Sequence, residues 1–233
     1  MANYHPADEL LMQFAAGQLT NALGIQTACH LEFCKQCRHK ARLYEQLGGD
    51  LIDSTTAVEV DRRAKEKLIE KLQQSIKVSD SKHSNNPVSK DSSYSDDFYI
   101  NKILQGNPQL PKPLRRFITN NYEDLPWSGF SKSIKSFDLP FSDDHYTARF
   151  YKITAGQELP EHTHLGNEFT LVLSGSFSDL AGDYHAGDFV LADTSTHHQP
   201  KAHKEKDCIC FAVMDAPLKM TGFFGRMLNP FIK

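Results

Sequence analysis

Two groups of histidine, cysteine and acidic residues have types and spacings that suit a bound metal ion. In the first, Cys34 and Cys37 form a Cys-x2-Cys pair, and His30 stands four residues before it. On one continuous helix these positions share a face, because residues i, i+4 and i+7 lie one above another. Two thiolates and an imidazole are three of the four ligands of a tetrahedral zinc site. His5 is well placed to supply the fourth if the first predicted helix packs antiparallel against the second.

A Cys-x2-Cys pair on a helix has a second interpretation, which is two small apolar side chains filling a core. The upstream His30 favours the metal site. Cys29 and His39 are spare candidates, but their angles on the predicted helix fit less well. The residues predicted to hold a structural zinc are therefore His5, His30, Cys34 and Cys37.

The second group follows the pattern Gly156-x5-His162-x-His164-x3-Glu168-x6-Gly175, which resembles the first motif of the cupin family. His162 and His164 are two residues apart, so both face the same side of an extended strand. Glu168 begins the next predicted strand and would turn its carboxylate into the same space. The spacing thus predicts a metal site inside a small barrel.

A remnant of the second cupin motif runs from Gly187 to Asp193 and on to His198. It departs from the family pattern at Asp193 and Ser195, where that pattern has proline and glycine. His197 is the neighbouring alternative, and the motif spacing favours His198. Zinc or another divalent transition metal suits such a set. The predicted ligands of this second site are His162, His164, Glu168 and His198.

The elements that must position the first group are helices. Apolar residues recur at helical spacing over residues 8–16, and Gly17 ends that segment. Thr20 is a suitable N-cap for a longer helix over residues 20–47, which the pair Gly48-Gly49 would stop. A third helix is predicted over residues 58–76, with a charged first half typical of a half-exposed helix.

The chain changes character after this helical start. Residues 78–97 contain seven serines and almost no large apolar side chain, so they predict a flexible linker. A connecting segment over residues 98–126 includes a helical piece at 114–119. From residue 127, short strand-like runs alternate with turn residues, most clearly at 146–154 and 168–173, as in a small barrel or sandwich.

The sequence therefore predicts a multidomain chain of α plus β class, an N-terminal zinc-bound helical bundle followed by a C-terminal β-barrel of the cupin type. The predicted parts are a helical domain over residues 1–77, a linker over 78–97, a connecting segment over 98–126 and a metal-binding barrel over 127–233.

Composition excludes two classes of partner. The formal net charge is −3, which gives no basic surplus for direct binding to nucleic acid. No apolar run approaches the roughly 18 residues that span a membrane, and the first residues lack the pattern of a signal peptide. The five cysteines are odd in number and clustered, which favours metal binding over a disulfide framework. We therefore expect a cytoplasmic protein.

The helical group resembles a known family of regulators. His5 followed by His30-x3-Cys34-x2-Cys37 looks like the zinc-binding anti-sigma domain, and each of the four residues matches a ligand position of that motif. The resemblance implies a small helical bundle that wedges between the two main lobes of an extracytoplasmic-function sigma factor. Such a bundle blocks the sigma surfaces that bind core RNA polymerase.

The strand-rich part resembles the C-terminal cupin of the ChrR type of these regulators. The resemblance covers residues 162–175, 187–188, 198–200, 207–210 and 215–218. It implies a zinc-binding cupin needed for the response to singlet oxygen and organic hydroperoxides, and an N-terminal domain that suffices to hold sigma. By this resemblance the chain is an anti-sigma factor and no enzyme.

Two points stay open at this stage. Cys208 and Cys210 lie two apart on a predicted strand, where they either fill the barrel or form a thiol pair that reacts with an oxidant. The alternative function is a cupin metalloenzyme, a dioxygenase or isomerase with a helical appendage, whose metal would keep positions open for substrate. The helical Cys/His pattern, for which such an enzyme has no need, argues against it. No pattern specifies an oligomeric state.

Overall fold

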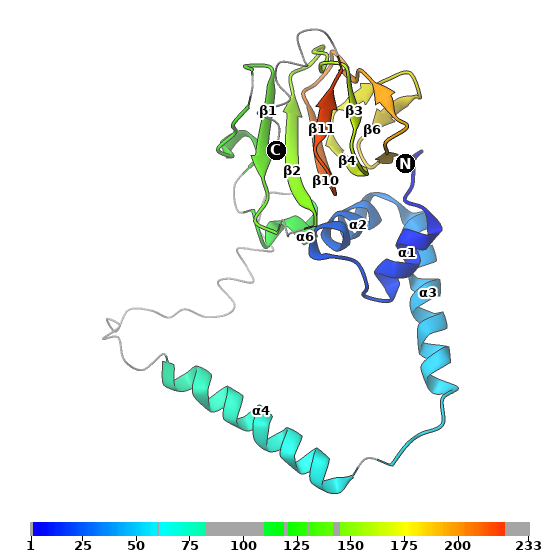
Figure 1. Cartoon of the computed structure of the whole chain (residues 1–233), viewed down its shortest axis with the longest axis vertical. Helices are drawn as coiled ribbons and strands as arrows, with labels where there is room; N and C mark the ends of the chain where they lie inside the picture. Colours follow the sequence, from blue (N-terminus) through cyan, green and yellow to red (C-terminus); the bar gives the residue numbers. More distant parts are fainter. Residues whose placement is uncertain are drawn as a thin grey trace. The chain divides into compact units, whose positions relative to one another are not determined.

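A computed structural model describes residues 2–59, 61–82, 110–118, 121–129, 131–141 and 145–221. The chain divides into two compact units, one formed by Met1–Gly49 with Gln105–Lys233 and the other by Asp50–Leu104 (Figure 1). Most of the predicted linker (residues 83–97), the start of the connecting segment (98–109) and residues 222–233 lie outside the described residues. The domain boundaries predicted from composition stay predictions.

The helix predicted over residues 20–47 is wrong as a single element. Two helices take its place, α2 (Asn21–Phe33) and α3 (Lys35–Asp53), and Cys34 between them is extended, with φ −109° and ψ 108°. The N–H of Cys34 completes the last turn of α2, and its carbonyl accepts the N–H of Arg38. Its Sγ also accepts the N–H of Cys37 at 3.4 Å, in the manner of an N-cap. One residue therefore closes the first helix and opens the second.

Glycines end one helix and fail to end another. Helix α1 (Asp8–Ala15) stops where predicted, and Gly17 follows it with a φ of +66°. Gly48 and Gly49 lie inside α3, and neither is among the glycines with positive φ. An interior glycine destabilises a helix by only about 1 kcal/mol. The four helical residues that follow Gly49 compensate for this loss. The stop predicted at these glycines is therefore wrong.

Helix α4 (Arg62–Lys82) belongs to the second unit. It begins later than the predicted residue 58, because the Asp61 carboxylate accepts the N–H of Arg63 at 3.0 Å and so caps it. It also continues through residues 78–82, which are the first residues of the predicted linker. The side chains described for this helix are exposed.

The described residues form eleven strands, and the strands predicted at 146–154 and 168–173 are among them. The bounds of the strands are β1 Ile134–Asp138, β2 Thr147–Ile153, β3 His162–His164, β4 Glu168–Ser174, β5 Ser176–Ser178, β6 Asp183–His185, β7 Phe189–Ala192, β8 His197–His198, β9 Lys201–Ala202, β10 Cys208–Met214 and β11 Leu218–Met220. Two short helical pieces precede them, α6 (Lys112–Arg115) and a 3-10 turn at Tyr122–Asp124. The first replaces the helix predicted at 114–119.

These strands form a five-stranded sheet in the order β1-β2-β10-β4-β7 and two three-stranded sheets, β11-β3-β8 and β6-β5-β9. The described neighbouring strands pair antiparallel. All seven residues of the central strand β10 are buried. Residues of all three sheets line one cavity of about 640 Å³, so the sheets close around a shared interior. The predicted barrel is thus confirmed.

The helical start and the strands share one hydrophobic core. Ala22 and Leu23 of α2 pack in the same cluster as Leu114 of α6 and Phe211 of β10, and α2 lies close to α6 and β10 in Figure 1. The buried amide of Gln26 donates to the strand carbonyls of Phe169 and Phe211, each at 2.7 Å. Two carbonyls at this junction are thereby hydrogen-bonded by the helix.

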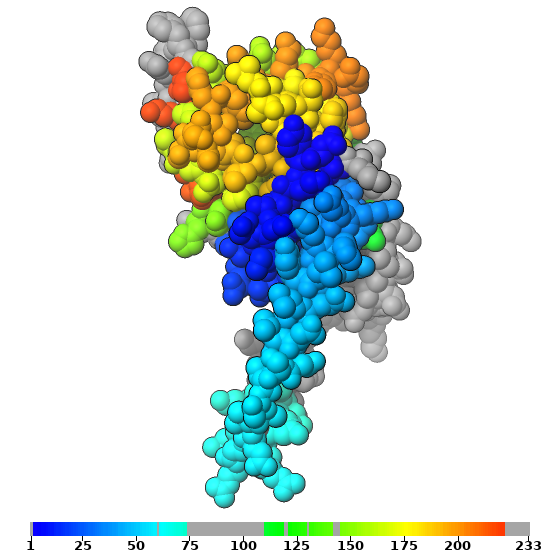
Figure 2. Space-filling view, turned by 90° about the vertical axis from the view of Figure 1, so that its right-hand side faces the viewer, coloured from blue at the N-terminus to red at the C-terminus, as the bar shows by residue number. Residues whose placement is uncertain are grey.

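The N-terminal segment also lies on the strands. In Figure 2 the first residues, in dark blue, lie across the strands drawn in yellow. The ring of Tyr4 packs against Tyr184 of β6, with the ring centroids 4.7 Å apart and the ring planes tilted by 54°. Within the described residues, no helix is long and apolar enough to cross a membrane.

Candidate metal centres

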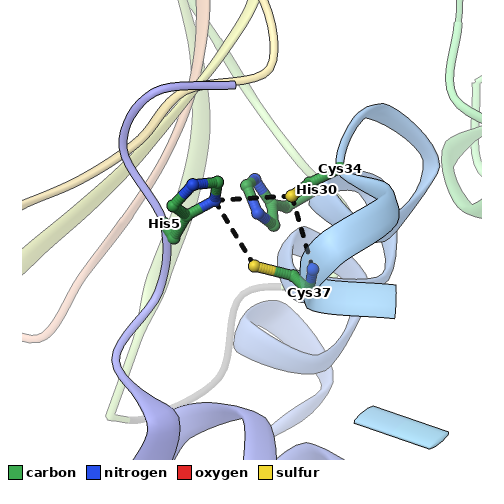
Figure 3. A group of neighbouring side chains, drawn as sticks. All are labelled: His5, His30, Cys34 and Cys37. Carbon is green, nitrogen blue, oxygen red and sulfur yellow. Dashed lines mark hydrogen bonds between the residues drawn. The ribbon is translucent and has the colours of Figure 1, made fainter. Parts of the chain in front are cut away.

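The four residues of the first predicted site come together in the folded chain. One ligand atom from each of His5, His30, Cys34 and Cys37 lies within 4.8 Å of the others. His5 Nδ1 is 3.4 Å from the Sγ atoms of both Cys34 and Cys37 (Figure 3). We call this set the thiolate centre. Its two sulfurs and two imidazoles are the donor set of a structural zinc site.

The spacing predicted that His30, Cys34 and Cys37 share one face of a single helix, and this prediction is wrong. His30 is in the last turn of α2, Cys34 is the extended residue after it, and Cys37 is in the first turn of α3. His5 comes from the segment before α1. A straight helix directs three such side chains outward in parallel, whereas the break at Cys34 turns two thiols and a ring toward a common point.

His30 has the surroundings of a metal-ligating histidine. The ring is fully buried, and its Nδ1 lies 2.8 Å from the carbonyl oxygen of Gly187. Because a carbonyl only accepts, Nδ1 carries the proton and Nε2 presents a lone pair. That Nε2 is buried and has no hydrogen-bond partner. A ring held by a backbone carbonyl with its other nitrogen free is the usual arrangement of a zinc ligand.

The electrostatics of the thiolate centre also suit a cation. Burial lowers the pKa of His30 to about 4, so the ring is neutral near pH 7. Burial and the neighbouring Cys34 raise the pKa of Cys37 to about 12. This thiol therefore stays protonated until a positive charge stabilises the thiolate. A zinc ion held by these four residues would supply that charge and fix the angle between α2 and α3.

The two spare candidates lie outside the thiolate centre. Cys29 is fully buried in the core shared by α2 and the strands, and burial raises the pKa of its thiol well above the usual value. It packs as a small apolar residue. His39 is exposed on α3.

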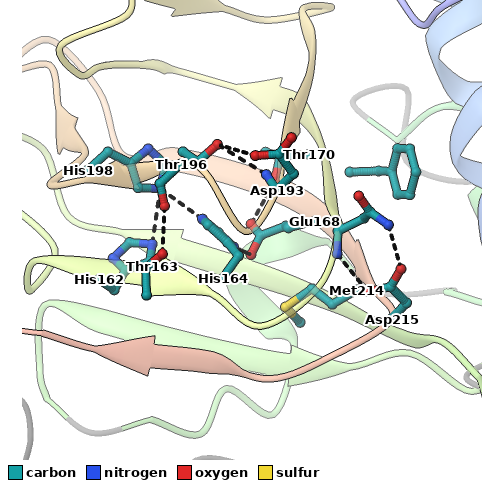
Figure 4. A network of polar contacts seen from close by, with 12 residues as sticks. His162, Thr163, His164, Glu168, Thr170, Asp193, Thr196, His198, Met214 and Asp215 are labelled. Atoms are coloured by element: carbon teal, nitrogen blue, oxygen red, sulfur yellow. Dashed lines mark hydrogen bonds and ion pairs between the residues drawn. The ribbon is translucent and has the colours of Figure 1, made fainter.

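Three residues of the second predicted site also converge. His162 and His164 lie on β3, and His198 on β8 pairs directly with His162. The Nε2 atom of His198 lies 3.1 Å from that of His162 and 3.2 Å from that of His164. We call this set the three-histidine centre (Figure 4). Three imidazole nitrogens aimed at one point are a donor set for zinc, iron, manganese or nickel.

A backbone carbonyl and a carboxylate orient two of these histidines through their Nδ1 atoms. His162 Nδ1 lies 2.8 Å from the carbonyl oxygen of Pro160, and His198 Nδ1 lies 2.8 Å from the nearly buried carboxylate of Asp179. Both contacts keep the Nε2 atoms pointing inward. Asp179 was missed in the sequence, because it follows β5 with no fixed spacing to the cupin motifs and only the turn brings it to His198.

Glu168, the fourth predicted ligand, lies beside the three-histidine centre and outside its group of converging atoms. Its Oε1 accepts the hydroxyl of Thr170 at 2.8 Å. Its Oε2 is 3.6 Å from His164 Nδ1, and both atoms are buried without a hydrogen-bond partner. Burial raises the pKa of Glu168. The carboxylate is therefore placed to hold the His164 ring, and its role as a fourth metal ligand stays a prediction.

His197, the alternative to His198, points away. Its side chain is half exposed, and its Nε2 lies 2.8 Å from the Thr221 hydroxyl.

Burial lowers the pKa of both His162 and His164 to about 4. These two rings are therefore neutral and able to ligate at physiological pH.

The 640 Å³ cavity opens beside the three-histidine centre and is lined by His162, His198 and Glu168 among many apolar side chains. Cys210 of β10 also lines it. Its Sγ is 3.6 Å from that of Cys208, and both thiols are buried and free. The hydrogen bond to Cys208, together with burial, raises the pKa of Cys210. The two cysteines face one side of the strand, as predicted, next to a site that a small molecule could enter.

Known proteins resemble this chain both over its cupin part and over nearly its whole length. Residues 115–216 match the family described as the ChrR Cupin-like domain. Over 99% of its length the chain is 30% identical to the anti-sigma-E factor ChrR of Cereibacter sphaeroides, covering 98% of that protein. It also resembles a chain in the crystal structure of Rhodobacter sphaeroides SigE in complex with the anti-sigma ChrR. That match has a TM-score of 0.71 and 28% identity, and it covers 92% of this chain and 100% of the other. The chain belongs to the ChrR family of anti-sigma factors.

Proposed function

We propose that this protein is a cytoplasmic, zinc-dependent anti-sigma factor. It holds an extracytoplasmic-function sigma factor away from RNA polymerase and releases it under oxidative stress sensed by the cupin. The sigma-binding part of this proposal is supported by the full-length similarity to an anti-sigma-E factor. It is also supported by the similarity to an anti-sigma ChrR whose crystal structure was determined in complex with SigE. The metalloenzyme alternative is set aside because a relative covering nearly the whole chain is a regulator.

Two helices each carry an exposed apolar stripe that suits such a partner. On α3, Leu43, Leu47 and Leu51 recur every four residues and are 47–60% exposed. On α4, Leu68 and Leu72 have the same spacing and are 56–58% exposed. Stripes of exposed leucine mark protein interaction sites. We infer that sigma covers both stripes.

The thiolate centre would have a structural role in this binding. Four protein ligands leave no coordination position for a substrate, so the metal serves to hold a shape. The shape concerned is the junction of α2 and α3, since the ligands come from both helices and from the break. Loss of the metal would free this junction and disorder the start of the sigma-binding helix α3.

The three-histidine centre would have the sensing role. Three protein ligands leave positions open on a metal, and the cavity beside it gives a small molecule access. Cys210 lines the same cavity, with Cys208 against it. We propose that singlet oxygen or an organic hydroperoxide acts at this metal, its ligands or these thiols, and that the change loosens the hold on sigma.

A transcription assay tests the proposal. RNA polymerase carrying an extracytoplasmic-function sigma factor from the same organism is titrated with the native chain and with a His30→Ala/Cys34→Ser/Cys37→Ser variant. The matched control is His39→Ala, which changes an exposed histidine on α3 outside the centre. We expect the native chain and the control to inhibit transcription and the triple variant to fail. No inhibition by the native chain, and no sigma complex in gel filtration, would refute the anti-sigma function.

A further inference from the structure

We propose that a turn of the cupin, residues 185–188 between β6 and β7, positions two of the four ligands of the thiolate centre. The inference rests on the thiolate centre binding metal, as proposed above. It assigns to Gly187 and Asp188 a role in holding His30 and His5, although Gly187 lies 157 residues after His30 and Asp188 lies 183 residues after His5.

The first contact is to His30. The Gly187 carbonyl accepts from Nδ1 of the buried His30 ring at 2.8 Å, which leaves Nε2 directed at the centre. No other described hydrogen bond fixes this ring. The cupin turn therefore selects both the tautomer and the orientation of this ligand.

The second contact is to the segment that ends in His5. Asp188 is fully buried, and its Oδ1 accepts the backbone N–H groups of Asn3 and Tyr4 at 2.5 and 3.1 Å. The N–H of Phe189 donates to the Tyr4 carbonyl at 3.1 Å. Three hydrogen bonds thus fasten the two residues directly before His5, which has no helix of its own to hold it.

The turn is shaped for these contacts. The other oxygen of Asp188 accepts the N–H of His185 at 2.8 Å, so its carboxylate is hydrogen-bonded on both sides. Gly187 has a φ of +99°, and a Cβ there would lie 2.9 Å from the Cβ of Phe33, at the end of α2. A glycine is needed both for the backbone conformation and for the close approach of the helix.

Two consequences follow from this arrangement. Weakening the turn lowers the metal affinity of the thiolate centre, because the ligands must then be ordered when the metal binds. Since coupling between sites is reciprocal, metal at the thiolate centre must in turn tighten the cupin turn. This turn would then couple the cupin to the thiolate centre, in addition to the core that α2 shares with the strands.

Cobalt provides a test that separates the two centres. A thiolate-to-cobalt charge-transfer band arises only where Co²⁺ is bound by cysteine, and the three-histidine centre has none. The full-length chain is titrated with Co²⁺ as the native protein and as Asp188→Asn, which keeps the shape but turns an amide group toward N–H donors. The matched control is Asp207→Asn, another cupin aspartate that accepts a backbone N–H, from Ala155, and belongs to neither centre.

We expect Asp188→Asn to lower the Co²⁺ affinity read from this band by about ten- to a hundredfold, as for other groups that hold a metal ligand. The control should match the native chain. A folded Asp188→Asn protein with native affinity would overturn the inference. Absence of the band in the native chain would instead overturn the thiolate centre itself.

Hydrogen exchange gives a second test, in which the sequence of the turn is unchanged. It tests the coupling between the turn and the thiolate centre even if Asp188→Asn fails to fold. The amides of Tyr4, His185 and Phe189 should exchange at least several times faster in Cys34→Ser/Cys37→Ser than in the metal-loaded native chain. Amides of β1 and β2, which contact neither the turn nor the centre, should be unchanged. Equal exchange at the turn in both proteins would overturn the inference.

Discussion

The two candidate metal centres of this chain differ in how they are built and in what they leave open. The thiolate centre combines four ligands from three separate segments that meet at a helix break. The three-histidine centre takes its ligands from two paired strands and lies beside a cavity of about 640 Å³. A closed set of four ligands suits a metal that holds structure, and an open set of three suits a metal that meets small molecules. The comparison supports the proposal that the helices bind sigma and that the cupin senses the oxidant.

The largest expected effect comes from emptying the thiolate centre. Cys34→Ser/Cys37→Ser should lose one metal ion per chain and abolish sigma binding, because a structural zinc contributes on the order of 10 kcal/mol to the folding of the segment it holds. Metal content by mass spectrometry and sigma binding by calorimetry check both. Sigma binding retained at native affinity would contradict the structural role.

Removing the metal from the three-histidine centre should leave sigma binding intact and abolish the response to oxidant. His162→Ala/His164→Ala should keep the thiolate-bound metal and native inhibition of sigma, but lose release of sigma by an organic hydroperoxide. The complex is treated with oxidant, and free sigma is measured over time for native and variant proteins. His197→Ala, which alters a half-exposed histidine pointing away from the centre, serves as the control. Normal release by the double variant would refute sensing at this metal.

The two centres should also differ in the pH dependence of metal affinity. Burial and Cys34 raise the pKa of Cys37 to about 12, so metal binding must displace its proton. The affinity of the thiolate centre should rise at least about tenfold per pH unit between pH 6 and 8. Burial lowers the pKa of His162 and His164 to about 4, so these rings release no proton in that range. The affinity of the three-histidine centre should therefore depend less steeply on pH, and an equally steep slope there would break the contrast.

A smaller effect is expected at the carboxylate that orients His198. Asp179→Asn should lower the affinity of the three-histidine centre about tenfold, because the amide holds the imidazole less strongly than the carboxylate 2.8 Å away. The thiolate centre should keep its affinity. Competition with a zinc chelator measures the affinities of the two centres separately. An unchanged affinity of the three-histidine centre would show that Asp179 has no positioning role.

The smallest effect concerns α3, which carries Cys37. Gly48→Ala should stabilise this helix by up to about 1 kcal/mol, since nothing lies within 4 Å of the added Cβ. Gly17→Ala is the matched control, because its Cβ also meets open space but its φ is +66°. It should destabilise the chain by about 1 kcal/mol. Urea unfolding of the metal-loaded proteins measures both, and equal effects would mean that backbone conformation is irrelevant here.

Local pattern decided most of the fold and much of each centre. The bounds of α1, β2 and β4 follow from apolar spacing and turn residues within a few positions. The pairs Cys34/Cys37 and His162/His164 are brought together by short-range geometry, so their spacing predicted them. The single helix over residues 20–47 failed for a related reason. Helical periodicity continues through Cys34, and the break becomes favourable only when its thiol accepts the Cys37 N–H beside the other ligands.

The sequence by itself therefore determined the types of the ligands, their spacing within each motif and the class of the two folded parts. Only the tertiary structure decided which groups hold those ligands. Asp179 reaches His198 through a turn, Gly187 reaches His30, and Glu168 lies beside His164. The physical reason is range. Helix and strand periodicity relate residues a few positions apart, whereas these contacts depend on how separate elements pack around a shared core.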